Sequence, residues 1–133
     1  MTPIRIAQEI ILMFRQATGK AGLNADLRGK LAAIDKSQAV IEFDLNGNVL
    51  HANDNFLQLL GYRLEEIQGR HHSLFVDPTC RTSDEYRLFW EKLRRGEYDA
   101  GQYGRIGKGG RQVWIQASYN PILDAKGKPY KVV

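Results

Sequence analysis

The sequence predicts an α+β domain in which short helices cover one face of a five-stranded antiparallel sheet. Three observations lead to this prediction. Apolar and polar residues alternate over 38–52 and again over 102–133, as in half-buried strands, whereas helical spacing prevails between them. Turn-forming residues, glycine above all, separate these segments. Two strands, several short helices, one longer helix and three strands therefore follow one another, an order typical of such a fold.

The first 37 residues are predicted to be helical. Residues 1–24 are assigned to an N-terminal extension and linker, and residues 25–37 to a short helix that leads into the domain. The extension is amphipathic, and its wide apolar face must be covered either by this domain or by the same helix of a second copy. We expect a homodimer, with an interface at Ile4, Ala7, Ile11 and Phe14.

Residues 38–133 are predicted to form the domain itself. Asn46-Gly47 is a hairpin turn signal between the first two strands. Asn53 or Asp54 is the candidate N-cap of a short helix that Gly61 ends. Ser83 is the candidate N-cap of a longer helix with an aromatic face.

The last third of the chain is predicted to be extended. Strands are expected over 102–106, 112–123 and 129–133, joined by glycine-containing turns. Because two valines end the chain inside a strand, we expect the sequence to be a fragment of a longer protein.

Composition and charge argue against several classes of function. The formal net charge is +4, but the two signs are interspersed, so no nucleic-acid partner is expected. Cys80 is the single cysteine and cannot form an internal disulfide, and the most apolar stretch, 4–14, is too short to span a bilayer. We therefore expect a cytoplasmic protein without membrane contact. No nucleophile turn or phosphate-binding loop is present, so an enzyme is not expected.

Several motifs occur in order over residues 38–133. The first half contains the run from Val40 to Asn53, then Asn55-Phe56-Leu57, Leu60-Gly61-Tyr62 and the segment from Leu64 to Arg70. The second half contains Phe89-Trp90, Gly96-Glu97, the segment from Gly107 to Gly110, the segment from Val113 to Ala117, and Asn120-Pro121-Ile122.

In order and spacing these motifs resemble those of a PAS sensory domain. The resemblance is strongest to the PAS modules at the N-termini of methyl-accepting chemotaxis receptors, including the aerotaxis and biofilm-dispersion types. It implies a PAS fold and a signal-transduction role, in which a pocket-bound cofactor detects redox state, oxygen or a small ligand. It also implies a downstream signalling region in the parent receptor. The alternative is a cofactor-free PAS dimerisation or protein-interaction module.

The resemblance to aerotaxis receptors implies FAD as the cofactor. Indole rings can stack on the flavin, and side-chain amides can bond its polar edge. The residues expected to bind it are Asn53, Asn55, His72, Trp90, Trp114 and Gln116.

Haem b is the alternative cofactor, and a domain without any cofactor is the third case. If haem is bound, His71 or His72 is the expected iron ligand. Without haem, no metal is expected. Adjacent residues on a helix point about 100° apart, so only one of the two can face a pocket. His72 also stands where light-oxygen-voltage domains carry their reactive cysteine, which excludes a flavin–thiol adduct at that position.

Overall fold

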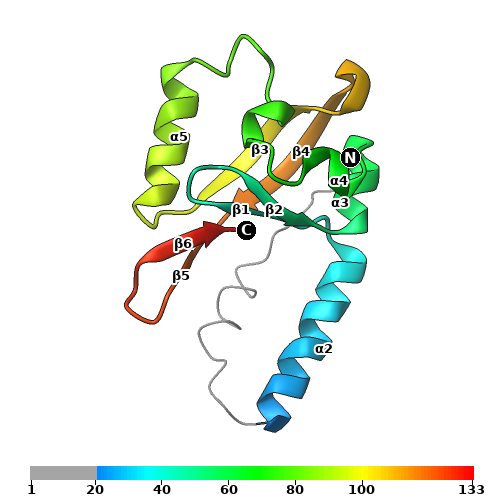
Figure 1. Ribbon diagram of the computed structural model, residues 1–133, viewed down its shortest axis with the longest axis vertical. Coiled ribbons are helices and arrows are strands. Elements are labelled where there is room, and N and C mark those ends of the chain that lie inside the picture. The colour runs from blue at the N-terminus through cyan, green and yellow to red at the C-terminus, as the bar shows by residue number, and fades with distance from the viewer. Residues whose placement is uncertain (1–20) are drawn as a thin grey trace.

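The computed structural model describes residues 21–133, so the interface expected at Ile4, Ala7, Ile11 and Phe14 lies outside the described residues. The helices are α2 (Ala21–Ser37), α3 (Asp54–Leu60), α4 (Leu64–Ile67) and α5 (Asp84–Arg94), with the 3-10 turns η1 (His72–Phe75) and η2 (Lys108–Gly110). The strands are β1 (Ile41–Asp44), β2 (Val49–Ala52), β3 (Asp99–Ile106), β4 (Gln112–Tyr119), β5 (Pro121–Leu123) and β6 (Pro129–Val132) (Figure 1).

Helix α2 begins earlier than the sequence predicted. It starts at Ala21, so part of the segment assigned to the linker, up to residue 24, is helical. Asn24 and its neighbours therefore lie within the helix and do not cap it. The helix projects away from the body of the domain (Figure 1).

All strand pairs are antiparallel, as predicted. One sheet has the order β2-β1-β6-β5, and β3 pairs with β4. The strand predicted over 112–123 is divided at Asn120, whose backbone N–H and C=O both bond to Val133, at 2.8 and 2.9 Å. The α+β class with helices beside an antiparallel sheet is confirmed, with six strands in place of five because of this division.

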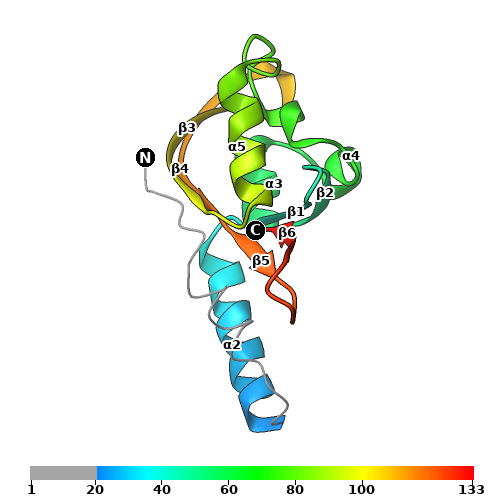
Figure 2. The same cartoon turned by 90° about the vertical axis from the view of Figure 1, so that its left-hand side faces the viewer.

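The main hydrophobic core lies between the helices and the inner face of the strands. Figure 2 shows β3 and β4 curving around α5. Strand β1 alternates as predicted, with Ile41 and Phe43 buried and the intervening residues half-buried. A second, smaller cluster forms on another face, where Ile122 and Val133 meet side chains of α2.

The predicted turn and caps are confirmed. The Asn53 side chain accepts a hydrogen bond from the Phe56 N–H, and the Ser83 side chain accepts one from the Tyr86 N–H. Gly61 ends α3 in the left-handed conformation, with φ of 79°. These local signals place α3 and α5, and hence the side chains they present to the core.

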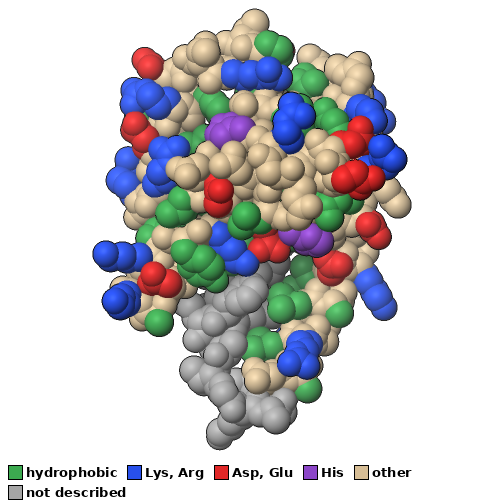
Figure 3. Space-filling view, in the orientation of Figure 1, with side chains coloured by type: hydrophobic (Ala, Val, Ile, Leu, Met, Phe, Trp, Pro, Cys, Tyr) green, Lys and Arg blue, Asp and Glu red, His purple; other side chains and the backbone are tan. Residues whose placement is uncertain are grey.

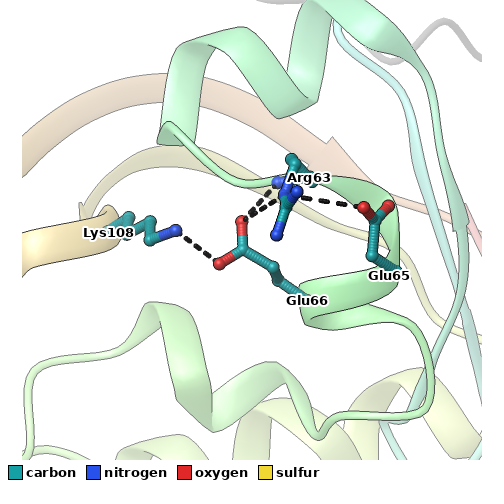
Figure 4. Close-up of polar contacts among 4 residues, drawn as sticks. All are labelled: Arg63, Glu65, Glu66 and Lys108. Atoms are coloured by element: carbon teal, nitrogen blue, oxygen red, sulfur yellow. Dashed lines mark hydrogen bonds and ion pairs between the residues drawn. The ribbon is translucent and has the colours of Figure 1, made fainter.

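The tip of the β3–β4 hairpin is attached to the short helices. Lys108 forms an ion pair with Glu66, whose carboxylate also accepts a hydrogen bond from the Arg63 N–H (Figure 4). The hydrogen bond from Lys108 lowers the pKa of Glu66, and the bond from Arg63 lowers it further. Arg111 donates to the Leu59 carbonyl at 2.7 Å. This attachment closes the core on the side of α3 and α4.

Candidate functional site

His72 lies in the interior and is only 1% exposed. It begins η1, between the short helices and α5. Its Nδ1 atom is 2.8 Å from the Tyr86 hydroxyl oxygen on α5, and its Nε2 atom is 3.2 Å from the Tyr119 hydroxyl oxygen on β4. A single imidazole therefore connects a helix and a strand that are far apart in the sequence.

Arg105 determines which ring nitrogen carries the proton. Its Nε and Nη2 atoms donate to the Tyr119 oxygen at 3.2 and 3.0 Å. With its oxygen accepting those bonds, Tyr119 uses its own O–H to donate to Nε2 of His72. We infer that the Nδ1 atom holds the proton and donates it to the Tyr86 oxygen.

Aromatic rings surround His72. The ring centroids of Phe43 and Trp90 lie 5.1 and 5.5 Å from that of the imidazole, both in edge-to-face geometry, and Phe89 lies 5.9 Å away. Trp90 is 3% exposed, and its indole N–H makes no well-aligned hydrogen bond among the described residues, although the Tyr86 hydroxyl is near enough to interact with it. An unpartnered buried donor is costly, so this N–H is a place where an acceptor would bind.

The surroundings keep His72 neutral. Burial lowers the pKa of the imidazole well below its ordinary value, and the charges of Arg105 and His71 lower it further. Burial also raises the pKa of Tyr86 to about 12. Both side chains are therefore uncharged near neutral pH, which suits hydrogen bonding inside an apolar cluster.

Side chains fill the interior where the sequence analysis expected a pocket. The cavity beside His72 measures about 10 Å³, and Phe43, Phe75, Arg105 and Tyr119 are among the residues that line it. That volume is about enough for one water molecule, whereas ligand pockets usually measure about 300–1,000 Å³. The cavity beside His72 is therefore much smaller than an isoalloxazine ring or a haem.

Asn53 and Asn55 lie away from the cavity. The Asn53 amide is buried and accepts from Val40 and Phe56, while it donates to Asp35 and Gln38. Asn55 donates to backbone carbonyls at the end of α2, including that of Lys36 at 3.0 Å. Both amides therefore fasten α2 to the domain, and neither faces the cavity that a cofactor would need.

Trp114 and Gln116 lie on the outer face of β4, which corrects their predicted placement in the pocket. Trp114 is 62% exposed and Gln116 is exposed, whereas Ile115 and Ala117 between and beside them are buried. The cause is strand geometry, since successive side chains point to opposite faces. Of the six predicted cofactor residues, the structure brings only His72 and Trp90 together in the interior.

The two histidines differ in burial, and only His72 enters the core. His71 is half-buried, and its Nδ1 atom accepts a hydrogen bond from the Ser73 N–H at 3.0 Å. Both nitrogens of His72 are engaged with tyrosines, so neither is free to bind iron. Within residues 21–133, no cluster of three or more histidine, cysteine, aspartate or glutamate side chains is arranged to hold a metal ion.

Sequence analysis missed Tyr86, Arg105 and Tyr119 as site residues. A signal for Tyr119 was present, because it shares the parity of Val113, Ile115 and Ala117 along β4. Tyr86 lies on the predicted aromatic face of α5. No sequence signal marked Arg105, whose role depends on the register that places β3 against β4.

Comparison with known protein families agrees with this architecture. Residues 49–133 match the PAS fold family, which is well over half of the chain. The chain belongs to the PAS fold family. The chain is 49% identical over 108 residues to the biofilm dispersion protein BdlA of Pseudomonas aeruginosa, a match that covers 81% of this chain and 26% of that protein. It is 32% identical over 80 residues to the aerotaxis receptor of Escherichia coli, which covers 60% of this chain and 16% of the receptor.

The chain therefore spans only about a quarter or less of the length of these two relatives. Solved structures show the same fold. A PAS domain from Colwellia psychrerythraea superposes with a TM-score of 0.68 and 20% identity, covering 80% of this chain and 90% of that one. A light-oxygen-voltage domain studied with a flavin analogue superposes with a TM-score of 0.65 and 23% identity, and the match covers 78% of this chain and 79% of that one. These identities establish the fold alone.

The described helices do not include a membrane-spanning candidate: between residues 21 and 133, none combines the length and the apolar character that crossing a bilayer requires. Positive and negative side chains are interspersed on the face seen in Figure 3. The family match and the two relatives are those of PAS sensor domains, which are signalling modules.

Proposed function

We propose that this PAS domain is the cytoplasmic sensory input module of a chemotaxis-type receptor and that its stimulus acts at His72. The observation that carries the proposal is the pair of tyrosine contacts to this buried imidazole. Any group that competes for either ring nitrogen changes the hydrogen bonds of α5 and β4 together. The likeness to a biofilm dispersion protein and an aerotaxis receptor supports the sensory role.

The stimulus we propose is a small molecule that carries hydrogen-bond acceptors, such as a carboxylate or carbonyl compound, and that displaces side chains around His72 as it enters, because the cavity there holds only about one water molecule. The interior offers two kinds of donor, the unpartnered Trp90 N–H and the Arg105 guanidinium. Arg105 lines the cavity and is half-exposed, so it lies between the interior and solvent. FAD and haem b, which the resemblance implied, have no support from this interior because its free volume is too small for either ring system.

A route for the output leads along β4. Tyr119, which bonds His72, precedes Asn120, and Asn120 exchanges two backbone hydrogen bonds with Val133. Val133 in turn packs near Leu31 and Ile34 of α2. A displacement of Tyr119 would therefore act on Val133 and, through it, on α2.

The test uses the purified 133-residue chain. We expect no flavin band and no Soret band to be retained after incubation with FAD or haemin and removal of unbound cofactor. In a thermal-shift panel of small carboxylates and carbonyl compounds, we expect at least one compound to raise the melting temperature. Trp90→Phe, which keeps an aromatic ring but removes the N–H together with the second ring of the indole, should weaken the binding of that compound about tenfold. Trp114→Phe, the same change on the exposed face of β4, should leave the binding unchanged. Stoichiometric retention of either cofactor would contradict the proposal.

A second candidate is the cofactor-free interaction module, and two observations favour it. The interior is nearly filled, and the outer sheet face exposes a large aromatic side chain, Trp114. If no compound in the panel binds and Trp114→Ala abolishes self-association or capture of the receptor's signalling region, the domain acts through this surface and not through His72.

A further inference from the structure

Arg105 carries a positive charge at the edge of the interior, with no carboxylate to balance it. Within the described part of the chain its side chain forms no ion pair: it donates to the Tyr119 hydroxyl at 3.2 and 3.0 Å and to the Gly104 carbonyl at 3.2 Å. The guanidinium also lies over the Tyr103 ring, 4.8 Å from its centroid. It lines the cavity beside His72 and is half-exposed. A cation that only neutral groups hold, at the edge of a cavity, is a place where an anion binds.

The hydrogen bonds through the His72 imidazole can run in two directions. With Arg105 in place, Tyr119 donates to Nε2, and Nδ1 donates to Tyr86. If Arg105 withdraws, Tyr119 can accept from Nε2, and Tyr86 can donate its own O–H to Nδ1. The Tyr86 oxygen then stays available to the nearby Trp90 N–H. Both directions satisfy the imidazole, so the bonds that Arg105 makes decide between them.

We propose that Arg105 is the anion-recognition residue of this site, and that a small carboxylate reverses the hydrogen bonds through His72 by drawing the guanidinium away from Tyr119. A carboxylate and a guanidinium form two parallel N–H···O bonds, which are roughly twice as strong as bonds between neutral groups. The Nε and Nη2 atoms, which share the single Tyr119 oxygen, form the matching fork. The choice of a carboxylate rests on the proposed function, but the direction set by Arg105 does not.

A monoanion suits this site better than a dianion. One uncompensated guanidinium charge matches one carboxylate, and an apolar interior disfavours any charge that remains unpaired. The cavity holds only about one water molecule, so the carboxylate must also be small. Acetate and propionate are therefore suitable probes.

The reversal moves protons but leaves every group neutral. Nε2 of His72 takes the hydroxyl proton of Tyr119, and Nδ1 gives its proton to the Tyr86 oxygen. Tyr86, which is half-exposed, releases its former hydroxyl proton to water, and Tyr119 takes one from water on the side that Arg105 leaves. Each of the three groups carries one proton before and after. The measurable change is the tautomer of His72, from Nδ1–H to Nε2–H.

Nitrogen NMR of the imidazoles tests the direction without any ligand. The isotope-labelled chain is measured at about pH 8, where an unperturbed imidazole is neutral and its protonated and unprotonated nitrogens give separate signals. We expect His72 to be mainly Nδ1–H. In Arg105→Met, which removes the N–H donors but keeps a long side chain, the ratio of Nδ1–H to Nε2–H should fall at least about tenfold. Arg95→Met, at an exposed side chain that pairs with Glu97, should leave the ratio unchanged.

The signals of His72 are assigned with His72→Gln, and His71 is the internal reference. The Nδ1 atom of His71 accepts a hydrogen bond from the Ser73 N–H at 3.0 Å, so His71 should remain Nε2–H in every folded variant. If Arg105→Met loses this signature, it has not folded, and the acetate measurement on the natural chain decides instead.

The second measurement titrates the natural chain with sodium acetate or sodium propionate, against sodium chloride at equal ionic strength. We expect a carboxylate to lower the ratio of Nδ1–H to Nε2–H at least about tenfold in the natural chain and to have no further effect in Arg105→Met. Acetamide, which has the same shape without the charge, should leave the ratio unchanged. Inorganic phosphate, mainly a dianion at this pH, should also leave it unchanged.

The outcomes separate this inference from the proposed function. An unchanged ratio in a folded Arg105→Met variant overturns the inference. So does a ratio that changes in the variant but with no carboxylate, or one that acetamide or phosphate changes as much as acetate does. A compound that raises the melting temperature and leaves the His72 tautomer unchanged supports the proposed function and overturns this inference. If no compound binds, the proposed function and the carboxylate half of the inference fail together.

Discussion

Strand β4 presents two surfaces with different physical roles. Its inner face places Tyr119 against His72 in a filled core, and its outer face leaves Trp114 lying over Gly104, largely in solvent. Both faces carry aromatic side chains, so residue type does not reveal which one serves the site. Alternate positions along a strand point to opposite faces, so the position of a residue in that alternation decides which face it is on. The hydrogen bonds available on that face then decide its role.

The largest expected effect is a difference in the free energy of unfolding between a variant in the core and a variant on the outer face of β4. Phe43→Ala removes a side chain that is 0% exposed and contacts both His72 and Trp90, so it should lower the free energy of unfolding by about 3–5 kcal/mol. Trp114→Ala should change that free energy by only about 0.5 kcal/mol. Chemical denaturation measures both. Similar losses would mean that the outer face is as much a part of the core as the inner one.

A smaller effect is expected at the turn beneath His71. Gly47 has φ of 85°, and a Cβ there would lie 2.7 Å from Nε2 of His71 and 3.1 Å from Trp90. Gly127 has φ of 80° with open space around it, so Gly127→Ala should cost only the left-handed backbone strain, about 1–2 kcal/mol. Gly47→Ala should cost more, up to about 3 kcal/mol. Equal costs in thermal unfolding would show that the His71 ring moves aside freely.

The third prediction concerns pH. The pKa of His72 is lower in the folded protein than in the unfolded chain, so the unfolded state binds a proton first as the pH falls below about 6.5. Stability should therefore decrease toward acid with a contribution of at most about 1.4 kcal/mol per pH unit from this residue. His72→Gln should flatten that slope. An unchanged slope in His72→Gln would place the imidazole in contact with solvent.

The smallest effect is expected at the attachment of the hairpin tip. Glu66→Gln removes the ion pair with Lys108, and the loss of stability should be smaller than in the other variants and should vanish at high salt. Because the pKa of Glu66 is lowered, its contribution is present above the ordinary carboxyl pKa and is lost as the pH falls through the folded value. Glu65→Gln, which affects only a contact with Arg63, is the control. A loss that persists at high salt would indicate a packing change at the tip.

Local signals in the sequence were reliable where a short segment determines its own conformation. The Asn46-Gly47 turn, the caps at Asn53 and Ser83 and the end of α3 at Gly61 were all predicted, because each depends on residues within about four positions. The candidate site was predicted less well. His72 and Trp90 are in the interior, but Trp114 and Gln116 are outside it, although the alternation along β4 already indicated their face.

The sequence by itself determined the class of fold, the order of its elements and the membership of the PAS family, because periodicity, caps and motif order are properties of neighbouring residues. Only the tertiary structure decided that Tyr86, Arg105 and Tyr119 converge on His72, and that their side chains leave a cavity of about 10 Å³. The physical reason is that volume and hydrogen-bond partners depend on how distant segments pack. No local pattern encodes the space that remains when a helix and a strand close over one another.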